Sequence, residues 1–197
     1  MSTKISAEQF FAAFEAEWQA ITSDPSIKGD TPFQDKTAWT TLIQAPGGFL
    51  NRVMDRLSSD ERPLYYRTEW FRVDALFLGG EDLYGKDHSW PSALDVLIEH
   101  EFGEALEEEM WKLIHIRAPL KVIISYDWAE VEKITQSRKE YAENKISALL
   151  TMLNKVNSHF PENHETEYLF LLAGREGVKS PIFWRKASNN SLQARRP

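Results

Sequence analysis

The sequence contains no cysteine among its 197 residues. Disulfide bonds, thiolate zinc sites and redox chemistry on a protein thiol are therefore excluded. The sequence also lacks any run of about 18 apolar residues, which a membrane-spanning helix requires. Its N-terminus has neither the basic start nor the apolar core of a secretion signal. We therefore expect a cytoplasmic protein with no membrane partner.

Two motifs of common enzyme classes are absent as well. There is no GxxxxGK loop to cradle phosphates and no GxSxG turn to present a nucleophilic serine. The adjacent glycines at 47–48 and 79–80 indicate turns instead. The sequence therefore supports neither a phosphate-binding loop nor a serine hydrolase.

Length and composition favour one globular domain. With 42% hydrophobic residues, the chain is long enough for a sizeable core. We predict a single domain over residues 1–188, with a helical N-terminal part at 1–60 and a core at about 64–126. Residues 189–197 are polar and predict a flexible tail.

Hydrophobic periodicity predicts an α/β fold. Apolar residues at three- and four-residue spacings indicate helices, and runs rich in β-branched and aromatic residues indicate strands. The region 64–78 predicts one long bent strand, or two strands that meet near Glu69 and Trp70. The expected fold is a central mixed sheet of four to six strands flanked by helices. The predicted helices are 7–21, 49–57, 104–116 and 128–158, with a short element at 37–43, and the other predicted strands are 94–101, 120–126, 166–173 and 182–185.

The strand at 94–101 carries acidic residues at alternate positions. Asp95, Glu99 and Glu101 point to one face of an extended strand, and Asp74 lies in the middle of the preceding strand. Clustered buried carboxylates repel one another unless a proton or a cation lies among them. The pattern predicts a divalent metal site at Asp74, Glu99 and Glu101, for which hard oxygen donors favour magnesium or manganese. The alternative is that these acids simply face water.

Glu69 is a candidate additional ligand. It alternates out of phase with Asp74 along a continuous strand, so both face one site only if the chain bends or bulges near Trp70. Asp95 lies at the start of its strand and is expected to cap a loop or to pair with a basic group. His100 faces the opposite layer, which favours a core histidine over a catalytic base.

The order of these residues resembles a known family. Asp74, then Glu99-x-Glu101 on the next strand, then a helix and the strand 120–126 resemble the PD-(D/E)XK nuclease superfamily, also called restriction-endonuclease-like. The resemblance spans about residues 64–126, and the segments 96–101 and 117–122 are also similar to a bacterial group of this type without an assigned role. It implies a restriction-endonuclease-like fold that binds magnesium or manganese and hydrolyses phosphodiester bonds in nucleic acid, with DNA as the expected partner.

The sequence departs from the family pattern at two positions. Val73 replaces the proline that often precedes the first acid, and Glu101 occupies the position of the usual lysine, which orients or deprotonates water in the family. Lys112 on the following helix is a candidate for a migrated ammonium, against the alternative of a plain surface lysine. The superfamily often adds an acid from a helix before the sheet, for which Glu15 or Glu17 is a candidate.

Basic residues beside aromatic ones are the candidates for nucleic-acid contact. Basic groups can bind phosphate while aromatic rings stack on bases, although an arginine packed over a tryptophan at a solvated edge gives the same pattern. The formal net charge of −7 argues against indiscriminate binding to nucleic acid. The candidate nucleic-acid-binding residues are Arg67, Arg72, Arg185 and Lys186.

Two further classes stay open. The missing lysine and the acidic total favour a catalytically inactive binding or regulatory module that keeps the nuclease fold. An acidic surface around Glu104 to Glu109 could also imitate nucleic acid, although a solvated first helical turn explains such a charge run more simply. The abundance of aromatic residues leaves room for a homodimer without requiring one.

Overall fold

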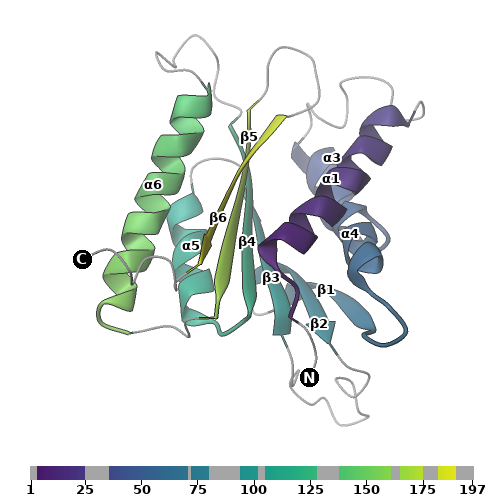
Figure 1. Ribbon diagram of the computed structural model, residues 1–197. Coiled ribbons are helices and arrows are strands. Elements are labelled where there is room, and N and C mark those ends of the chain that lie inside the picture. The colour runs from purple at the N-terminus through teal and green to yellow at the C-terminus, as the bar shows by residue number, and fades with distance from the viewer. Residues whose placement is uncertain are drawn as a thin grey trace. The chain divides into compact units, whose positions relative to one another are not determined.

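The computed structural model describes residues 4–24, 36–70, 72–79, 94–101, 105–127, 138–160, 165–174 and 182–189. It is an α/β structure, as predicted (Figure 1). The helices are α1 (Ala7–Ser23), α3 (Lys36–Gln44), α4 (Phe49–Leu57), α5 (Leu106–His115) and α6 (Arg138–Asn157). The strands are β1 (Leu64–Trp70), β2 (Val73–Gly79), β3 (Leu94–Glu101), β4 (Leu120–Asp127), β5 (Glu167–Gly174) and β6 (Ile182–Asn189).

The strands form a mixed sheet with the order β1-β2-β3-β4-β5-β6. The pairs β1/β2, β2/β3 and β5/β6 are antiparallel.

Contacts divide the chain into two compact units. Unit 1 comprises Met1–Ile98 and Ala118–Leu120, and unit 2 comprises Glu99–Arg117 and Lys121–Pro197.

Unit 1 begins with a well-capped helix. The Ser6 hydroxyl accepts a hydrogen bond from the Gln9 amide, and the Gln9 side chain accepts one from the Ser6 amide, which is a capping box. Helix α1 then places Phe10 and Phe14 in an aromatic core. The ring of Phe10 lies 5.8 Å from that of Phe77 on β2, and the ring of Phe14 lies 4.9 Å from that of Phe49 on α4. Aromatic burial therefore holds α1 against β2 and against α4.

The region 64–78 folds as a hairpin and not as one bent strand. Tyr66 pairs with Phe77 and Trp70 pairs with Val73, so the chain reverses its direction between Trp70 and Val73. Arg72 has a φ of 61°, the left-handed conformation that such a tight reversal often uses. Of the two alternatives for this region, the two-strand alternative is confirmed.

Unit 2 contains a pair of helices beside the strands β4 and β5. Helix α5 packs on α6, and α6 contacts β5. Leu113 of α5 and Leu149 and Leu153 of α6 are fully buried, as are Val122 and Phe170 of the strands. The spacing of four residues between the two leucines of α6 gives that helix one apolar face, as the sequence predicted.

Most predicted elements agree with the structure to within a few residues. Helix α6 begins at Arg138, whereas residues 128–137 of the predicted helix lie outside the described residues. Strand β6 extends to Asn189, the first residue of the predicted tail, and 190–197 also lie outside. The single domain stays a prediction. No helix among the described residues is long and apolar enough to span a bilayer.

His100 is a core residue. Its side chain lies on β3 in unit 2 with 4% of its surface exposed. Burial lowers the pKa of its imidazole to about 3, because the charged form loses its hydration. The ring is therefore neutral near pH 7, as expected for a core histidine.

This burial predicts an acid sensitivity. The unfolded chain protonates His100 below a pKa of about 6.5, whereas the folded chain does not until about pH 3, so stability falls as the pH drops between these values. We expect His100 to account for a loss of about 2–3 kcal/mol between pH 7 and about pH 4.5. Urea unfolding at both pH values measures it. His100→Gln should lose this sensitivity and exposed His115→Gln should keep it; equal sensitivity in all three proteins contradicts the assignment.

Candidate functional site

A buried ion pair lies at the end of strand β3. The side chain of Glu99 has 1% of its surface exposed, and its Oε1 lies 3.0 Å from Nζ of Lys112. The same ammonium forms a second ion pair with Oε2 of Glu109. One lysine therefore bridges two carboxylates, which we call the Glu99–Lys112–Glu109 cluster.

Helix α5 positions two members of this cluster. Its buried face consists of Leu106, Glu109, Met110, Leu113 and Ile114. Lys112 stands at the edge of that face with 23% of its side chain exposed, three residues after Glu109. Residues three apart are neighbours on a helix surface, so the ammonium reaches Glu109 on its own helix and Glu99 on β3. The lysine stem can cover apolar surface while its charged end meets the acids.

The cluster keeps Lys112 protonated. Burial alone would lower the pKa of its ammonium, but hydrogen bonds to Glu109 and Glu99 and the attraction of both carboxylates outweigh burial. The net effect raises the pKa of Lys112 above its ordinary value. Lys112 therefore serves as a cation and a hydrogen-bond donor and is a poor proton acceptor near neutral pH.

Asp74 lies in unit 1, half-buried on β2. It is close enough to Tyr66 to act on that phenol: burial, with a smaller contribution from the Asp74 charge, raises the pKa of Tyr66 above its usual range. The Tyr66 hydroxyl donates a hydrogen bond of 2.8 Å to the backbone carbonyl of Gln44. Glu101 is half-buried at the end of β3. The joint metal-binding role of Asp74, Glu99 and Glu101 stays a prediction.

Glu69 is exposed, and its φ is 53°. It lies between the pairs Thr68↔Ala75 and Trp70↔Val73, where Asp74 is the corresponding residue of the opposite strand. The phase argument against Glu69 assumed a continuous strand. A hairpin puts cross-strand counterparts on one face of the sheet, so that argument does not apply here. Its role as a ligand stays a prediction.

Two other acids are held by arginines. Asp95 forms an ion pair with Arg62, which confirms its expected pairing with a basic group. Glu17 accepts a hydrogen bond from Nε of Arg52 at 3.1 Å and another from Nε of Arg56. With its carboxylate bound to two guanidinium groups, Glu17 is a poor choice for an additional metal ligand. Glu15, the alternative, is exposed on α1.

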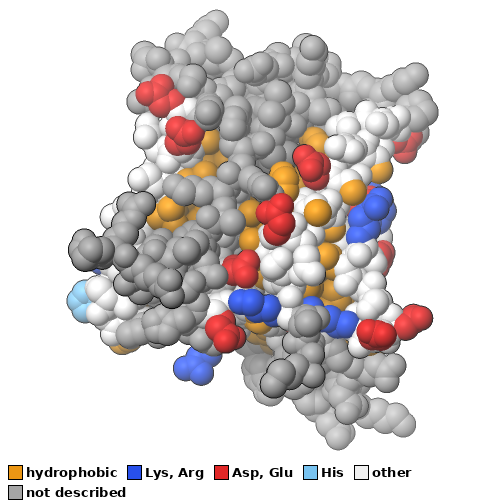
Figure 2. Space-filling model, viewed as in Figure 1, with side chains coloured by type: hydrophobic (Ala, Val, Ile, Leu, Met, Phe, Trp, Pro, Cys, Tyr) orange, Lys and Arg blue, Asp and Glu red, His pale blue; other side chains and the backbone are white. Residues whose placement is uncertain are grey.

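The predicted nucleic-acid contacts are only partly described. Arg67 and Arg72 are exposed at the β1–β2 hairpin. The side chains of Arg185 and Lys186 lie outside the described part, although both residues belong to β6. On the face shown in Figure 2, the described acidic and basic side chains are interspersed and form no continuous basic surface.

Three residues with functional chemistry were not predicted from the sequence. Glu109 was assigned only to the charged first turn, although it falls on the stripe of Leu106, Met110 and Leu113, which is a signal for burial. Lys121 stands within the apolar run of β4 and is completely buried. Its Nζ lies 3.2 Å from Oη of Tyr168 and 5.1 Å from the centre of that ring.

Among the residues that the structure describes, no three His, Cys, Asp or Glu side chains form a group that could hold a metal ion.

The comparisons with known proteins leave the family of this chain open. No family model, curated protein or solved structure matches it. The functional assignment therefore depends on the residues of the chain itself.

Proposed function

We propose that this protein is a restriction-endonuclease-like hydrolase that cleaves phosphodiester bonds in nucleic acid, with DNA as the expected substrate, in the presence of magnesium or manganese. The observation that carries the proposal is the 3.0 Å contact between Lys112 and Glu99. In the family that the sequence resembles, a lysine stands two residues after the second acid. Glu101 occupies that position here, and Lys112 supplies an ammonium beside the second acid from a neighbouring helix.

The use of Asp74 together with Glu99 is what the resemblance implies. Asp74 lies on β2 and Glu99 on β3.

The donor set suits a hard cation with few protein ligands. Magnesium keeps several waters and commonly binds one or two carboxylates together with substrate phosphates. Glu99 and Asp74 would hold it, and Glu101 and Glu69 are further candidates. When bound, the ion would activate water and offset negative charge on the phosphate. Magnesium binding therefore does not require three protein ligands at one place among the described residues.

The residues of the cluster have separate tasks in this proposal. Glu99 contributes a buried negative charge that either a metal or an ammonium can satisfy. Glu109 keeps the Lys112 ammonium in place and charged. A protonated lysine stabilises negative charge that develops on a phosphate oxygen. This electrostatic stabilisation is strongest where water is excluded. His100, neutral and buried, has no part in proton transfer.

A specific observation favours the inactive module as a second candidate. Lys112 already neutralises Glu99, so the buried carboxylate has no need of a metal ion. In that case the protein would bind nucleic acid or a partner without cleaving it. The homodimer stays a prediction in both cases.

Cleavage assays distinguish the two candidates. We expect the wild-type protein to cleave single- or double-stranded DNA or RNA with magnesium or manganese, and Asp74→Asn and Glu99→Gln to abolish cleavage. Lys112→Met should lower the rate by about 100- to 1,000-fold, as the loss of one electrostatic group at a transition state does. The matched control is Lys145→Met, which removes another lysine–glutamate pair, the 3.4 Å contact with Glu107.

A rescue experiment sharpens the assignment of Lys112. Glu101→Lys restores an ammonium at the usual family position, so it should recover part of the rate in the Lys112→Met background. Equal cleavage by all variants would identify a contaminant and refute the proposal. No cleavage by the wild-type protein, together with no saturable magnesium binding in calorimetry, would establish the module instead.

A further inference from the structure

The exposed side of helix α5 carries a large aromatic residue. Trp111 has 55% of its surface in water, and Phe160, which follows α6, has 75%. They are the two large hydrophobic side chains exposed among the described residues. A water-exposed tryptophan contributes nothing to the core through its open face, so its place calls for another explanation.

The ring of Trp111 stacks against a histidine on the same helix. The ring of His115, one helical turn later, lies 4.3 Å from the indole ring with a tilt of 38°. Nδ1 of His115 lies 2.7 Å from the backbone carbonyl of Trp111. A carbonyl oxygen only accepts, so Nδ1 carries the proton and donates it. The hydrogen bond locks the imidazole against the indole and leaves little side-chain entropy to lose on binding.

A helix cap alone does not explain this arrangement. A histidine near a helix C-terminus satisfies a carbonyl and interacts well with the helix dipole, which accounts for His115. It does not account for the exposure of Trp111. His159 at the end of α6 makes the corresponding contact, with Nδ1 3.0 Å from the carbonyl of Lys155, and it does so without a tryptophan one turn earlier.

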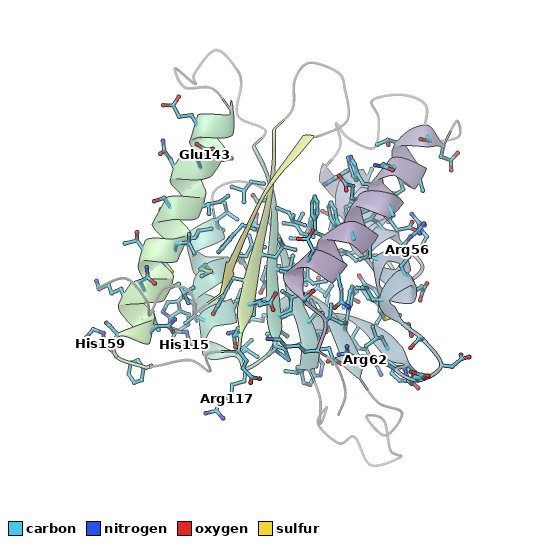
Figure 3. The ribbon with its side chains drawn as sticks, viewed as in Figure 1. Arg56, Arg62, His115, Arg117, Glu143 and His159 are labelled. Atoms are coloured by element: carbon cyan, nitrogen blue, oxygen red, sulfur yellow. The ribbon has the colours of Figure 1, made fainter. Side chains whose placement is uncertain are left out.

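A cation stands at the same end of the stack. Figure 3 shows His115 and His159 at one end of the α5–α6 pair, with Arg117 extending away from the protein beside them. Arg117 is exposed and follows α5 by two residues. Exposed Glu108, one turn before Trp111, is the acid on the other side. Arg117 thus supplies a cation beyond the C-terminal end of the stack, and Glu108 places an acid at its N-terminal end.

We propose that Trp111, His115 and Arg117 form a platform that binds single-stranded nucleic acid. The indole supports an unpaired base, and Arg117 binds the neighbouring phosphate. Stacking on an aromatic ring requires a base that is free of its own stack, which favours a single strand over a duplex. An exposed ring and an exposed arginine at one end of α5 supply a stacking surface and a cation for a phosphate, whereas a protein partner would need a larger continuous apolar surface. The platform does not require cleavage and applies to either candidate function.

Binding of a fluorescein-labelled oligo(dT) strand, measured by anisotropy in EDTA, tests the platform. EDTA prevents metal-dependent cleavage, so failure of this proposal is distinguishable from failure of the nuclease proposal. We expect Trp111→Leu, which keeps an apolar side chain but removes the ring, to weaken binding about 10- to 100-fold. Tyr141→Leu, a half-buried aromatic near the start of α6, is the matched control and should bind like the wild-type protein.

Charge variants test the position of the phosphate. Arg117→Ala should weaken binding and reduce the slope of log affinity against log salt by about 0.7, the value for one phosphate contact on a single strand. Glu108→Gln should strengthen binding. The proposal is overturned if the wild-type protein does not bind oligo(dT), if it prefers the same strand paired with oligo(dA), or if Trp111→Leu and Tyr141→Leu bind equally. Circular dichroism of each variant verifies that the helices remain folded.

Discussion

The buried charge of Glu99 is the constraint on which the functional interpretation depends. A carboxylate with 1% of its side chain exposed would incur a desolvation cost of several kcal/mol without a nearby cation. Lys112 supplies that cation, and Glu109 shares it. Removal of the ammonium would leave the buried charge of Glu99 uncompensated, whereas removal of Glu99 would leave Lys112 paired with Glu109. A glutamate at position 99 of β3 therefore requires that α5 turn Lys112 toward this strand.

Two other acids of low exposure among the described residues, Glu17 and Asp95, are satisfied differently from Glu99. Glu17 and Asp95 are held by arginines, whose planar guanidinium groups match a carboxylate and do not lose their charge. Glu99 is held by a lysine, a compact charge on a flexible stem. A lysine can move aside more readily than a guanidinium that makes directional hydrogen bonds. This difference separates the arginine pairs, which suit a structural role, from the Glu99 pair, which suits exchange with a metal or a phosphate.

Local patterns predicted the elements well, because helix and strand periodicity is a property of neighbouring residues. The apolar positions at 49, 50, 53, 54 and 57 defined α4 to the residue, and alternation along 94–101 defined β3. The turn between β1 and β2 was harder to predict, since 64–70 and 73–79 are both rich in residues that favour strands. Its position depends on the pairing of Trp70 with Val73, which is a contact between strands.

The site could be predicted only in part. The chemistry of β3 suggested a missing cation near Glu99, and Lys112 was one candidate for it. That Lys112 reaches Glu99 depends on how far α5 is rotated about its axis, which the sequence of β3 does not specify. Glu109 was missed because acids in a first helical turn are usually solvated. Its position among buried apolar residues indicates that its side chain is buried. The ion pair with Lys112 depends on how the helix packs, which the sequence alone does not give.

The measurement that tests the account most directly is a double-mutant cycle on Glu99 and Lys112, read as the free energy of unfolding in urea. If the two charges depend on each other, Lys112→Met alone should cost about 3–5 kcal/mol, because it leaves Glu99 buried and without its ammonium. Glu99→Gln combined with Lys112→Met should then recover most of that loss. Costs that simply add, within about 0.5 kcal/mol, would show that the two groups are independent and would contradict the central claim.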